Sequence, residues 1–371
     1  MKIIQNPTFL QMAGNAGRLT NHFYITSRVD GNKLTFDNGL LGVFSDNVEY
    51  SVGSQENWER LSKETVITIN EGQSVYFRNY TGVVNTNVRA VLFDITDEFD
   101  AGGNIMRLLY PGQSSVPANG MNALFRELHI ISAADLELTA ENVGAYAYSS
   151  MFYGCTGLTT APELPATALA ENCYSSMFYG CTGLTTAPEL PATALAKNCY
   201  SSMFYGCTGL TTAPELPATA LAVNCYFEMF YGCTGLTTAP ELPATALAVY
   251  NCYGSMFQGC TGLTTAPELP ATALAVNCYN SMFADCTGLT TAPELPATAL
   301  AESCYSAMFY GCSSLTSITC LATEISADEC VSDWLSGVAD TGTFTKAADM
   351  EDWPDGDSGI PTGWTVEDYV A

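Results

Sequence analysis

Cysteines are the residues of this sequence whose chemistry stands out most, and all fifteen lie between Cys155 and Cys330. Fourteen fall in two columns whose spacings alternate between 18 and 8 residues over most of this stretch, with Cys320 as an extra member. The two columns are Cys155, Cys181, Cys207, Cys233, Cys260, Cys286 and Cys312, and Cys173, Cys199, Cys225, Cys252, Cys278, Cys304 and Cys330. Zinc sites use close pairs such as C-x₂-C, usually with histidine, and no histidine follows His129. Because an odd count leaves at least one thiol free and cysteine packs as a small hydrophobe, we favour buried, reduced thiols over a disulfide framework.

No catalytic set can be recognised among the other side chains. The two histidines, His22 and His129, lie in different regions, and no nucleophile elbow, phosphate-binding loop or dinucleotide fingerprint is present. The segment DWPDGDSGIP places Asp352, Asp355 and Asp357 at a loosely calcium-like spacing, but it lacks the twelfth-position glutamate of an EF-hand loop. A plain acidic turn is therefore preferred. We predict no enzyme activity, no catalytic residues, no metal site and no cofactor.

One acidic column could bind a ligand. The stretch TGLTTAPELPATALA occurs six times without change, starting at residues 156, 182, 208, 234, 261 and 287. Its glutamate precedes a leucine that should point inward, so the glutamates should point outward in a line at about 5 Å spacing. The candidate ligand-binding residues are Glu163, Glu189, Glu215, Glu241, Glu268, Glu294, Thr160, Thr186 and Thr212. Either they form a periodic surface for a cationic or polyhydroxyl polymer, or duplication copied a residue whose like-charge repulsion is tolerated.

The charge of the chain restricts the classes of partner. The formal net charge is −26, from 12 basic and 38 acidic residues. Residues 127–371 hold only Lys197 and Lys346 against twenty-six acids, so we predict no nucleic-acid partner. No apolar run approaches about 18 residues, which predicts no membrane insertion. The N-terminus lacks the continuous apolar segment of an export leader, so the protein works inside a cell, leaves by another route, or has had a leader removed.

A repeat must position these columns. Successive Met-Phe pairs, beginning at Met151 and ending at Met308, are 26 residues apart except for one interval of 27. The extra residue falls between Leu247 and Cys252, where a turn should accept it. Each unit has one segment suited to a short strand, limited by two prolines, and one, ENCYSSMFYGC, suited to one or two helical turns. One strand plus one helix every 20–29 residues is the leucine-rich-repeat pattern, with an unrelated α/β solenoid as the alternative.

Stacking of such units should turn each apolar position into a ladder through the core. The phenylalanines of the Met-Phe pairs should form a continuous aromatic spine, and degenerate first and last units should act as caps. The members of the spine are Phe152, Phe178, Phe204, Phe230, Phe257, Phe283 and Phe309.

The flanking regions complete the predicted organisation. Segments rich in Val, Ile, Thr, Tyr and Phe between about residues 20 and 105 predict six or more strands without helices, hence a β-sandwich of roughly immunoglobulin type. We predict an N-terminal arm (1–20), a β-sandwich domain (21–105), a leucine-rich-repeat α/β solenoid including degenerate end units (106–330), and a C-terminal cap (331–371). Trp334, Trp353 and Trp364 should cover the last unit, with exposed binding aromatics as the alternative.

Three motifs carry a family resemblance. CYSSMFYGCTGLTTAPELPAT resembles the BspA-like leucine-rich repeats of gut Bacteroidetes. GTFTKAADMEDWPDGDSGIPTGWTVEDY is similar to the C-terminal cap found with them, and VEYSVGSQENWERL with TITINEGQSVYFRNYTG resembles the β-domain that precedes them. The resemblance covers most of the chain from about residue 40. It implies surface adhesion or recognition and carries no functional residues with it.

Two functional hypotheses follow. The first is a phage virion fibre or decoration protein on the virion surface, which contacts a host cell-surface glycan or protein and other virion proteins through its N-terminal region. A homo-oligomer is then expected. The second is a bacterial cell-surface adhesin without its leader. The position of the gene among tail and capsid genes would favour the first.

Overall fold

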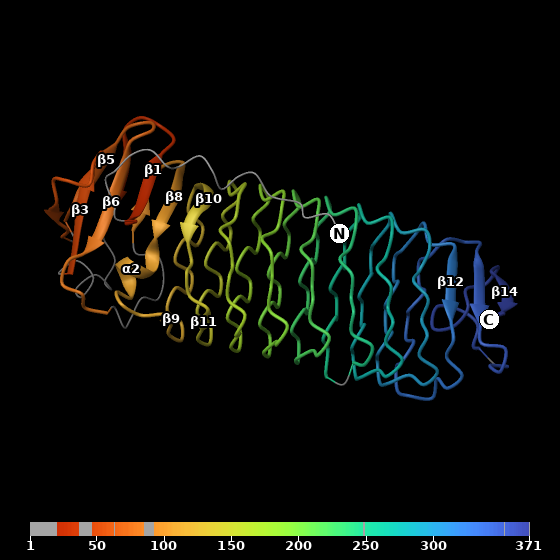
Figure 1. The fold of residues 1–371 in the computed structure, drawn as a ribbon. Coiled ribbons are helices and arrows are strands. Elements are labelled where there is room, and N and C mark those ends of the chain that lie inside the picture. The colour runs from red at the N-terminus through yellow and green to blue at the C-terminus, as the bar shows by residue number, and fades with distance from the viewer. Residues whose placement is uncertain are drawn as a thin grey trace, which may run out of the picture.

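The fold is an elongated stack of backbone rungs with small β-sheets at both ends (Figure 1). The computed structural model describes residues 21–36, 47–62, 64–84, 93–247, 249–351 and 353–370. The predicted N-terminal arm, residues 1–20, lies outside them.

The N-terminal strands form a six-stranded sheet in the order β10-β8-β1-β6-β3-β4 and a three-stranded sheet in the order β5-β2-β7. Pairing is antiparallel except between β8 and β10. The strands are β1 (Phe23–Ser27), β2 (Asn32–Thr35), β3 (Val48–Val52), β4 (Glu59–Arg60), β5 (Val66–Ile69), β6 (Ser74–Asn79), β7 (Asp94–Ile95), β8 (Phe99–Asn104) and β10 (Ile130–Glu137). They match the strand-rich segments predicted here, although most of VRAVLFDI lies outside the described residues. The sandwich arrangement and the domain boundaries stay predictions.

The sheet continues into the stack through β10. One edge of β10 pairs with β8, and on the other side Ser132 bridges Thr160 of the first full unit. A short helix, α2 (Ile105–Leu109), follows β8 directly; the side chain of Asn104 accepts a hydrogen bond from the Arg107 amide and caps it. The next rung contact is the pair β9 (Ser115–Val116) and β11 (Asn142–Val143). Figure 1 shows β1, β8 and β10 side by side at the start of the rungs.

The units stack in parallel, as predicted, but through single bridges instead of continuous strands. Thr186 bridges Thr212, which bridges Thr238, and Ala168 bridges Ala194 in the same way. Between these two columns lie Pro162, Pro165 and their equivalents, which have no N–H to donate. The prolines therefore explain why the ladder is interrupted in every unit.

The helical turns predicted for ENCYSSMFYGC are wrong. The segment is a run of overlapping β-turns in which alternate amides donate to the carbonyl three residues back and to the next unit. Cys173, Met177 and Cys181 are of the first kind, whereas Tyr174 donates to Cys199 of the next unit. Every fourth residue has a positive φ, +57° at Asn172, +55° at Ser176 and +70° at Gly180, as the third position of a type II turn requires. Half of the amides therefore bond between units, which an α-helix would not allow.

The predicted aromatic spine is confirmed. Ring centroids of successive phenylalanines from Phe125 to Phe309 are 5.3 to 5.7 Å apart and nearly parallel. A second buried column runs from Tyr148 to Tyr305, with centroids 5.5 to 6.1 Å apart. Methionine and cysteine columns fill the remaining core and are fully buried. Identical units pack by repeating one rotamer solution.

The C-terminal cap closes the stack with a parallel sheet, β12 (Ser317–Cys320), β13 (Thr343–Lys346) and β14 (Thr365–Asp368). Trp334 is fully buried and continues the tyrosine column, 6.3 Å from Tyr305 and 5.5 Å from Trp353. Trp364 is buried as well. The prediction that these tryptophans cover the last unit is confirmed.

The extra residue of the 27-residue interval lies at the predicted place. Next to it Tyr250 is 49% exposed, and its hydroxyl accepts a hydrogen bond from Asn277. The columns on both sides of it, from Phe230 to Phe257 and from Tyr226 to Tyr253, are uninterrupted. The insertion is therefore absorbed at the surface without a shift of the core.

Candidate binding surface

The six glutamates of the acidic column are exposed, as the sequence predicts. In each unit the glutamate lies between two buried or half-buried positions; Leu164, which follows Glu163, is 3% exposed and packs in the core. The prolines on either side hold φ near −65°, which keeps this outward projection the same from unit to unit. None of the ion pairs in the described part of the chain involves these six glutamates.

Open grooves lie between neighbouring Pro-Glu-Leu-Pro segments, and each contains two of these carboxylates. Three such grooves have volumes of about 440, 450 and 420 Å³. They hold Glu163 with Glu189, Glu215 with Glu241, and Glu268 with Glu294, and their walls are proline rings with alanine or leucine. We refer to these as the Pro-Glu grooves. A carboxylate pair flanked by proline rings can accept hydrogen bonds from hydroxyl, amide or ammonium donors and contact C–H surfaces.

The predicted threonines take a neighbouring position. Thr160, Thr186 and Thr212 are exposed and bridge from rung to rung, but they do not line the grooves. The structure therefore brings the glutamates together with the prolines and places this threonine column beside the grooves.

The acidic column has one more member than the sequence analysis assigned. Asn142 bridges Ala168, 26 residues further on, and this offset aligns Glu137 with Glu163. The Glu137 carboxylate accepts hydrogen bonds from the side-chain amides of Asn21 and Asn104. The divergent sequence around Glu137, DLELTA in place of PELPAT, hides this relationship.

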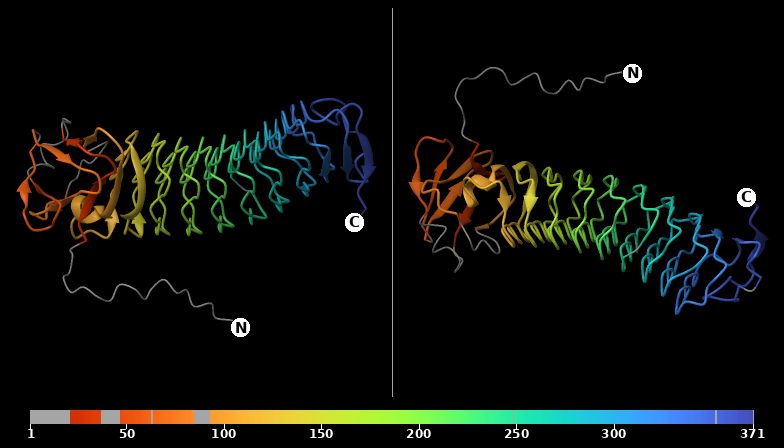
Figure 2. Two further views of the ribbon diagram at one scale, coloured as in Figure 1. Left: turned by 90° about the horizontal axis from the view of Figure 1, so that it is seen from above. Right: turned by 60° about the horizontal axis from the view of Figure 1, so that its bottom comes forward.

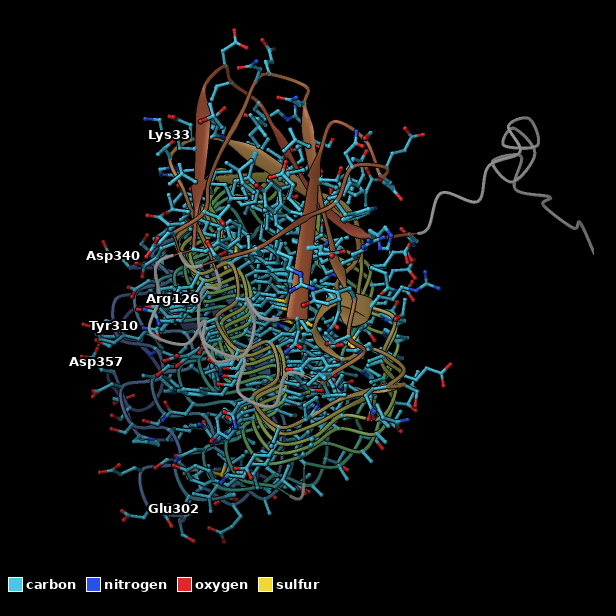
Figure 3. The ribbon with its side chains drawn as sticks, turned by 90° about the vertical axis from the view of Figure 1, so that its left-hand side faces the viewer. Lys33, Arg126, Glu302, Tyr310, Asp340 and Asp357 are labelled. Atoms are coloured by element: carbon cyan, nitrogen blue, oxygen red, sulfur yellow. The ribbon has the colours of Figure 1, made fainter. Side chains whose placement is uncertain are left out.

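A surface ladder of four tyrosines was also missed. Tyr153, Tyr179, Tyr205 and Tyr231 are half-buried, with ring centroids 4.4 to 4.6 Å apart, and the Arg126 guanidinium lies 4.4 Å from the Tyr153 ring. Partial burial, together with the rings of its two neighbours and Glu228, raises the pKa of Tyr205 to about 12. The repeated FYGC motif was the available signal. Figure 3 looks along the stack and shows Arg126 and Tyr310, of the same column, on one side.

Unequal spacing of the two tyrosine columns shows how the stack curves. Units are 4.4 to 4.6 Å apart at the surface tyrosines but 5.5 to 6.1 Å apart at the buried ones. The edge with the surface tyrosines therefore lies nearer the axis about which the units turn. The resulting bend is visible in both views of Figure 2.

All fifteen cysteines are buried and unpaired. The thiols of the Cys155–Cys312 column donate to a phenylalanine carbonyl of the preceding unit at 2.9 to 3.1 Å. Burial raises the pKa of each thiol, to about 12 at Cys155, Cys199 and Cys252. Within the described residues, no group of three or more His, Cys, Asp or Glu side chains could hold a metal ion. The cysteine columns thus act in packing and as donors to buried carbonyls.

The acidic turn near the C-terminus is held by hydrogen bonds. Asp357 accepts one from the Ser336 hydroxyl through its side chain and one from the Leu335 amide through its carbonyl. Asp352, the first member of the calcium-like spacing, lies outside the described residues.

Comparison with known proteins identifies the repeats. The family model described as BspA type leucine-rich repeat region matches six copies, over residues 123–264 and 226–331, which together span more than half of the chain. No curated protein and no solved structure matches the chain. In the part of the chain that the structure describes, no helix has the length and apolar character needed to cross a bilayer.

Proposed function

The chain belongs to the BspA-type leucine-rich repeat family, and from this we propose that it is a non-enzymatic recognition protein that contacts a cell surface through its Pro-Glu grooves. The family is often associated with surfaces and adhesion, and leucine-rich repeats are generally scaffolds for interaction. The proposed partner is a host cell-surface glycan or protein.

The observation that carries the proposal is the repetition of one groove along the stack. Three grooves present the same proline and glutamate residues at successive pairs of units. A polymeric ligand, or a ligand displayed many times on a cell, would contact several grooves at once. Weak individual contacts would then combine into a high overall affinity. The dominance of carboxylates favours neutral or cationic ligands and disfavours nucleic acids.

The proposed location is the surface of a virion that infects gut Bacteroidetes, where the protein would act as a fibre or decoration; the alternative is the bacterial cell surface. The N-terminal sheets close one end of the stack and leave its sides uncovered (Figure 1). Attachment to other virion proteins through the N-terminal region, and a symmetric homo-oligomer, would suit this arrangement. Mass spectrometry of purified virions and of proteins shaved from intact cells would distinguish the two locations by the fraction that contains the protein.

Binding to intact host cells tests the proposed function. The full chain is compared with a variant carrying Glu189→Gln, Glu215→Gln and Glu241→Gln, which removes three central carboxylates of the grooves. A control variant with Glu171→Gln, Glu302→Gln and Asp328→Asn loses the same charge from exposed turns elsewhere in the stack. We expect the groove variant to lose at least about tenfold in apparent affinity and the control to change little. Equal binding by all three proteins would show that the grooves are not the contact surface.

A further inference from the structure

A fourth groove, larger than the Pro-Glu grooves, lies where the N-terminal sheet meets the first unit. Its volume is about 530 Å³, and it is lined from four places in the chain: β1 with the residue before it, the end of β8, β10 with the turn after it, and the first full unit. The side chains that carry the following argument are Asn21, Tyr24, Asp135, Glu137, Glu163 and Pro165. We refer to this site as the junction groove.

An aromatic ring distinguishes the junction groove from the Pro-Glu grooves. Tyr24 points from the outer face of β1, and its ring lies against the backbone of Gly102 on β8. A Cβ atom at position 102 would come within 2.3 Å of the ring, so only glycine permits this position. Asp135 accepts a hydrogen bond from the Tyr24 hydroxyl, which fixes the ring beside the acidic residues.

Hydrogen-bonding groups surround the ring on the other walls. Asp135 is exposed, Glu163 is exposed, and Glu137 is half-buried and already holds the amides of Asn21 and Asn104. Pro165 adds a second apolar surface. The groove thus combines an oriented ring, several carboxylate acceptors and an amide that has both donor and acceptor atoms.

This combination matches a neutral sugar. The C–H face of a pyranose packs on an aromatic ring while its hydroxyls donate to carboxylates and exchange hydrogen bonds with an amide. We propose that the junction groove binds a neutral pyranose unit of a cell-surface glycan, stacked on Tyr24 and hydrogen-bonded by Asp135 and Glu163. The inference rests on the proposed function and gives it a ligand class.

The charge of the groove argues against an anionic sugar. No lysine or arginine lines the groove, and three carboxylates do. A carboxylated or sulfated sugar would be repelled at this distance. A polyamine would be attracted by the charge alone, so it is the competing ligand that the experiment must separate.

Calorimetry and saturation-transfer NMR on the full chain test the proposal. The probes are neutral tetrasaccharides of glucose, galactose, mannose and N-acetylglucosamine, with tetragalacturonate and spermidine as anionic and cationic comparisons. We expect at least one neutral tetrasaccharide to bind, with Tyr24 ring protons close to the sugar. Tyr24→Ala should weaken this binding by about tenfold or more, whereas Tyr24→Phe, which keeps the ring, should stay within about threefold.

Two further variants keep the result interpretable. Tyr76→Ala removes the neighbouring ring on the same face, 5.6 Å from Tyr24 but outside the groove, and should leave sugar affinity within about threefold. Asp135→Asn changes an exposed groove residue and should weaken binding even if Tyr24→Ala disturbs folding, which a thermal melt would report. Binding of spermidine alone, or sugar binding that neither Tyr24→Ala nor Asp135→Asn weakens, would overturn the proposal.

Attachment of the same proteins to host cells separates this inference from the proposed function. Wild-type protein that binds cells but no neutral tetrasaccharide would overturn the junction groove alone. Sugar binding that depends on Tyr24, without any attachment to cells, would instead overturn the cell-surface function and leave the groove as a sugar site.

Discussion

The thiol sulfur of Cys207 lies 3.0 Å from the carbonyl oxygen of Phe178 in the preceding unit. The same oxygen also accepts the backbone amide of Cys181. Because the carbonyl is buried, the thiol supplies a second donor where water cannot reach. The same bond recurs along the whole column, so its members are fixed by hydrogen bonding as well as by volume.

Replacing one of these thiols should measure that contribution. Cys207→Ala removes a buried sulfur and one weak hydrogen bond, and we expect it to lower the free energy of unfolding by about 1–2 kcal/mol. Thr208→Ala changes the exposed neighbour and should have an effect below about 0.5 kcal/mol. Urea denaturation followed by circular dichroism measures both. Equal effects would mean that the thiol column contributes nothing specific.

Alkaline pH should unfold the stack because of its thiols. Burial raises the pKa of thiols such as Cys199 and Cys252 from 9.0 to about 12. In the unfolded chain they ionise near pH 9, so their stabilising effect is complete below pH 9 and is lost as the pH rises from 9 towards 12. At pH 10 each such thiol lowers stability by about 1.4 kcal/mol relative to neutral pH.

Thiolate absorbance and circular dichroism, recorded together during an alkaline titration, check this expectation. The thiolate signal should appear together with the loss of structure, and a thiol reagent at neutral pH should react only after denaturation. Thiolates that form near pH 9 in a chain with unchanged circular dichroism would show that the cysteines are accessible.

Backbone strain at Asp285 offers a stabilising substitution. Asp285 has a φ of +60° at a position that is glycine in most units, such as Gly180 with a φ of +70°. Because a side chain costs about 1–2 kcal/mol in this left-handed region, Asp285→Gly should stabilise the protein by about 0.5–1 kcal/mol after the entropy of the added glycine is included. The converse change, Gly180→Asp, should destabilise it. Thermal melts would contradict the argument if both changes moved the midpoint in the same direction.

These turns also explain which part of the fold the sequence could predict. The period of 26 residues and the inward columns follow from spacing alone, and Phe178 and Leu164 lie where the pattern places them. The helix was predicted from apolar residues at i and i+4, but the overlapping turns have the same four-residue period. The spacing of Asn172, Ser176 and Gly180, two of which readily adopt positive φ, was the signal for turns.

The candidate sites divide in the same way. The Pro-Glu grooves repeat within the unit, so their glutamates could be identified from one copy. The junction groove instead joins Tyr24 to Glu137 and Glu163 through the pairing of β1 with β8 and of β8 with β10. No local pattern encodes that pairing, and the parallel contact of β10 with β8 becomes visible only in the folded chain.

The two adjacent aromatic columns should differ in their effect on stability. Phe204 is fully buried in the spine, whereas Tyr205 lies on the surface ladder. Phe204→Ala should cost about 3–5 kcal/mol, because it leaves a cavity between two stacked rings. Tyr205→Ala should cost about 1 kcal/mol, because it loses ring stacking without a core cavity. Chemical denaturation of the two variants measures the difference, and similar losses would mean that the surface ladder is part of the core.

Charge repulsion along the acidic column should make the groove glutamates mutually unfavourable. Neighbouring carboxylates lie on successive rungs, which are about 5 Å apart in a parallel ladder, and none of the six takes part in the ion pairs of the described residues. Two unit charges at that separation repel by about 1 kcal/mol in water. The triple change Glu189→Gln, Glu215→Gln and Glu241→Gln removes repulsion between these neighbours and should raise the free energy of unfolding by roughly 1–2 kcal/mol at low salt. Because salt screens this repulsion within about 3 Å at 1 M, the gain should shrink as salt is added. Thermal melts of the triple variant and the wild type at low salt and at 1 M measure it. A triple variant no more stable than the wild type at low salt would show that solvent already cancels the repulsion, so that the column costs the fold nothing.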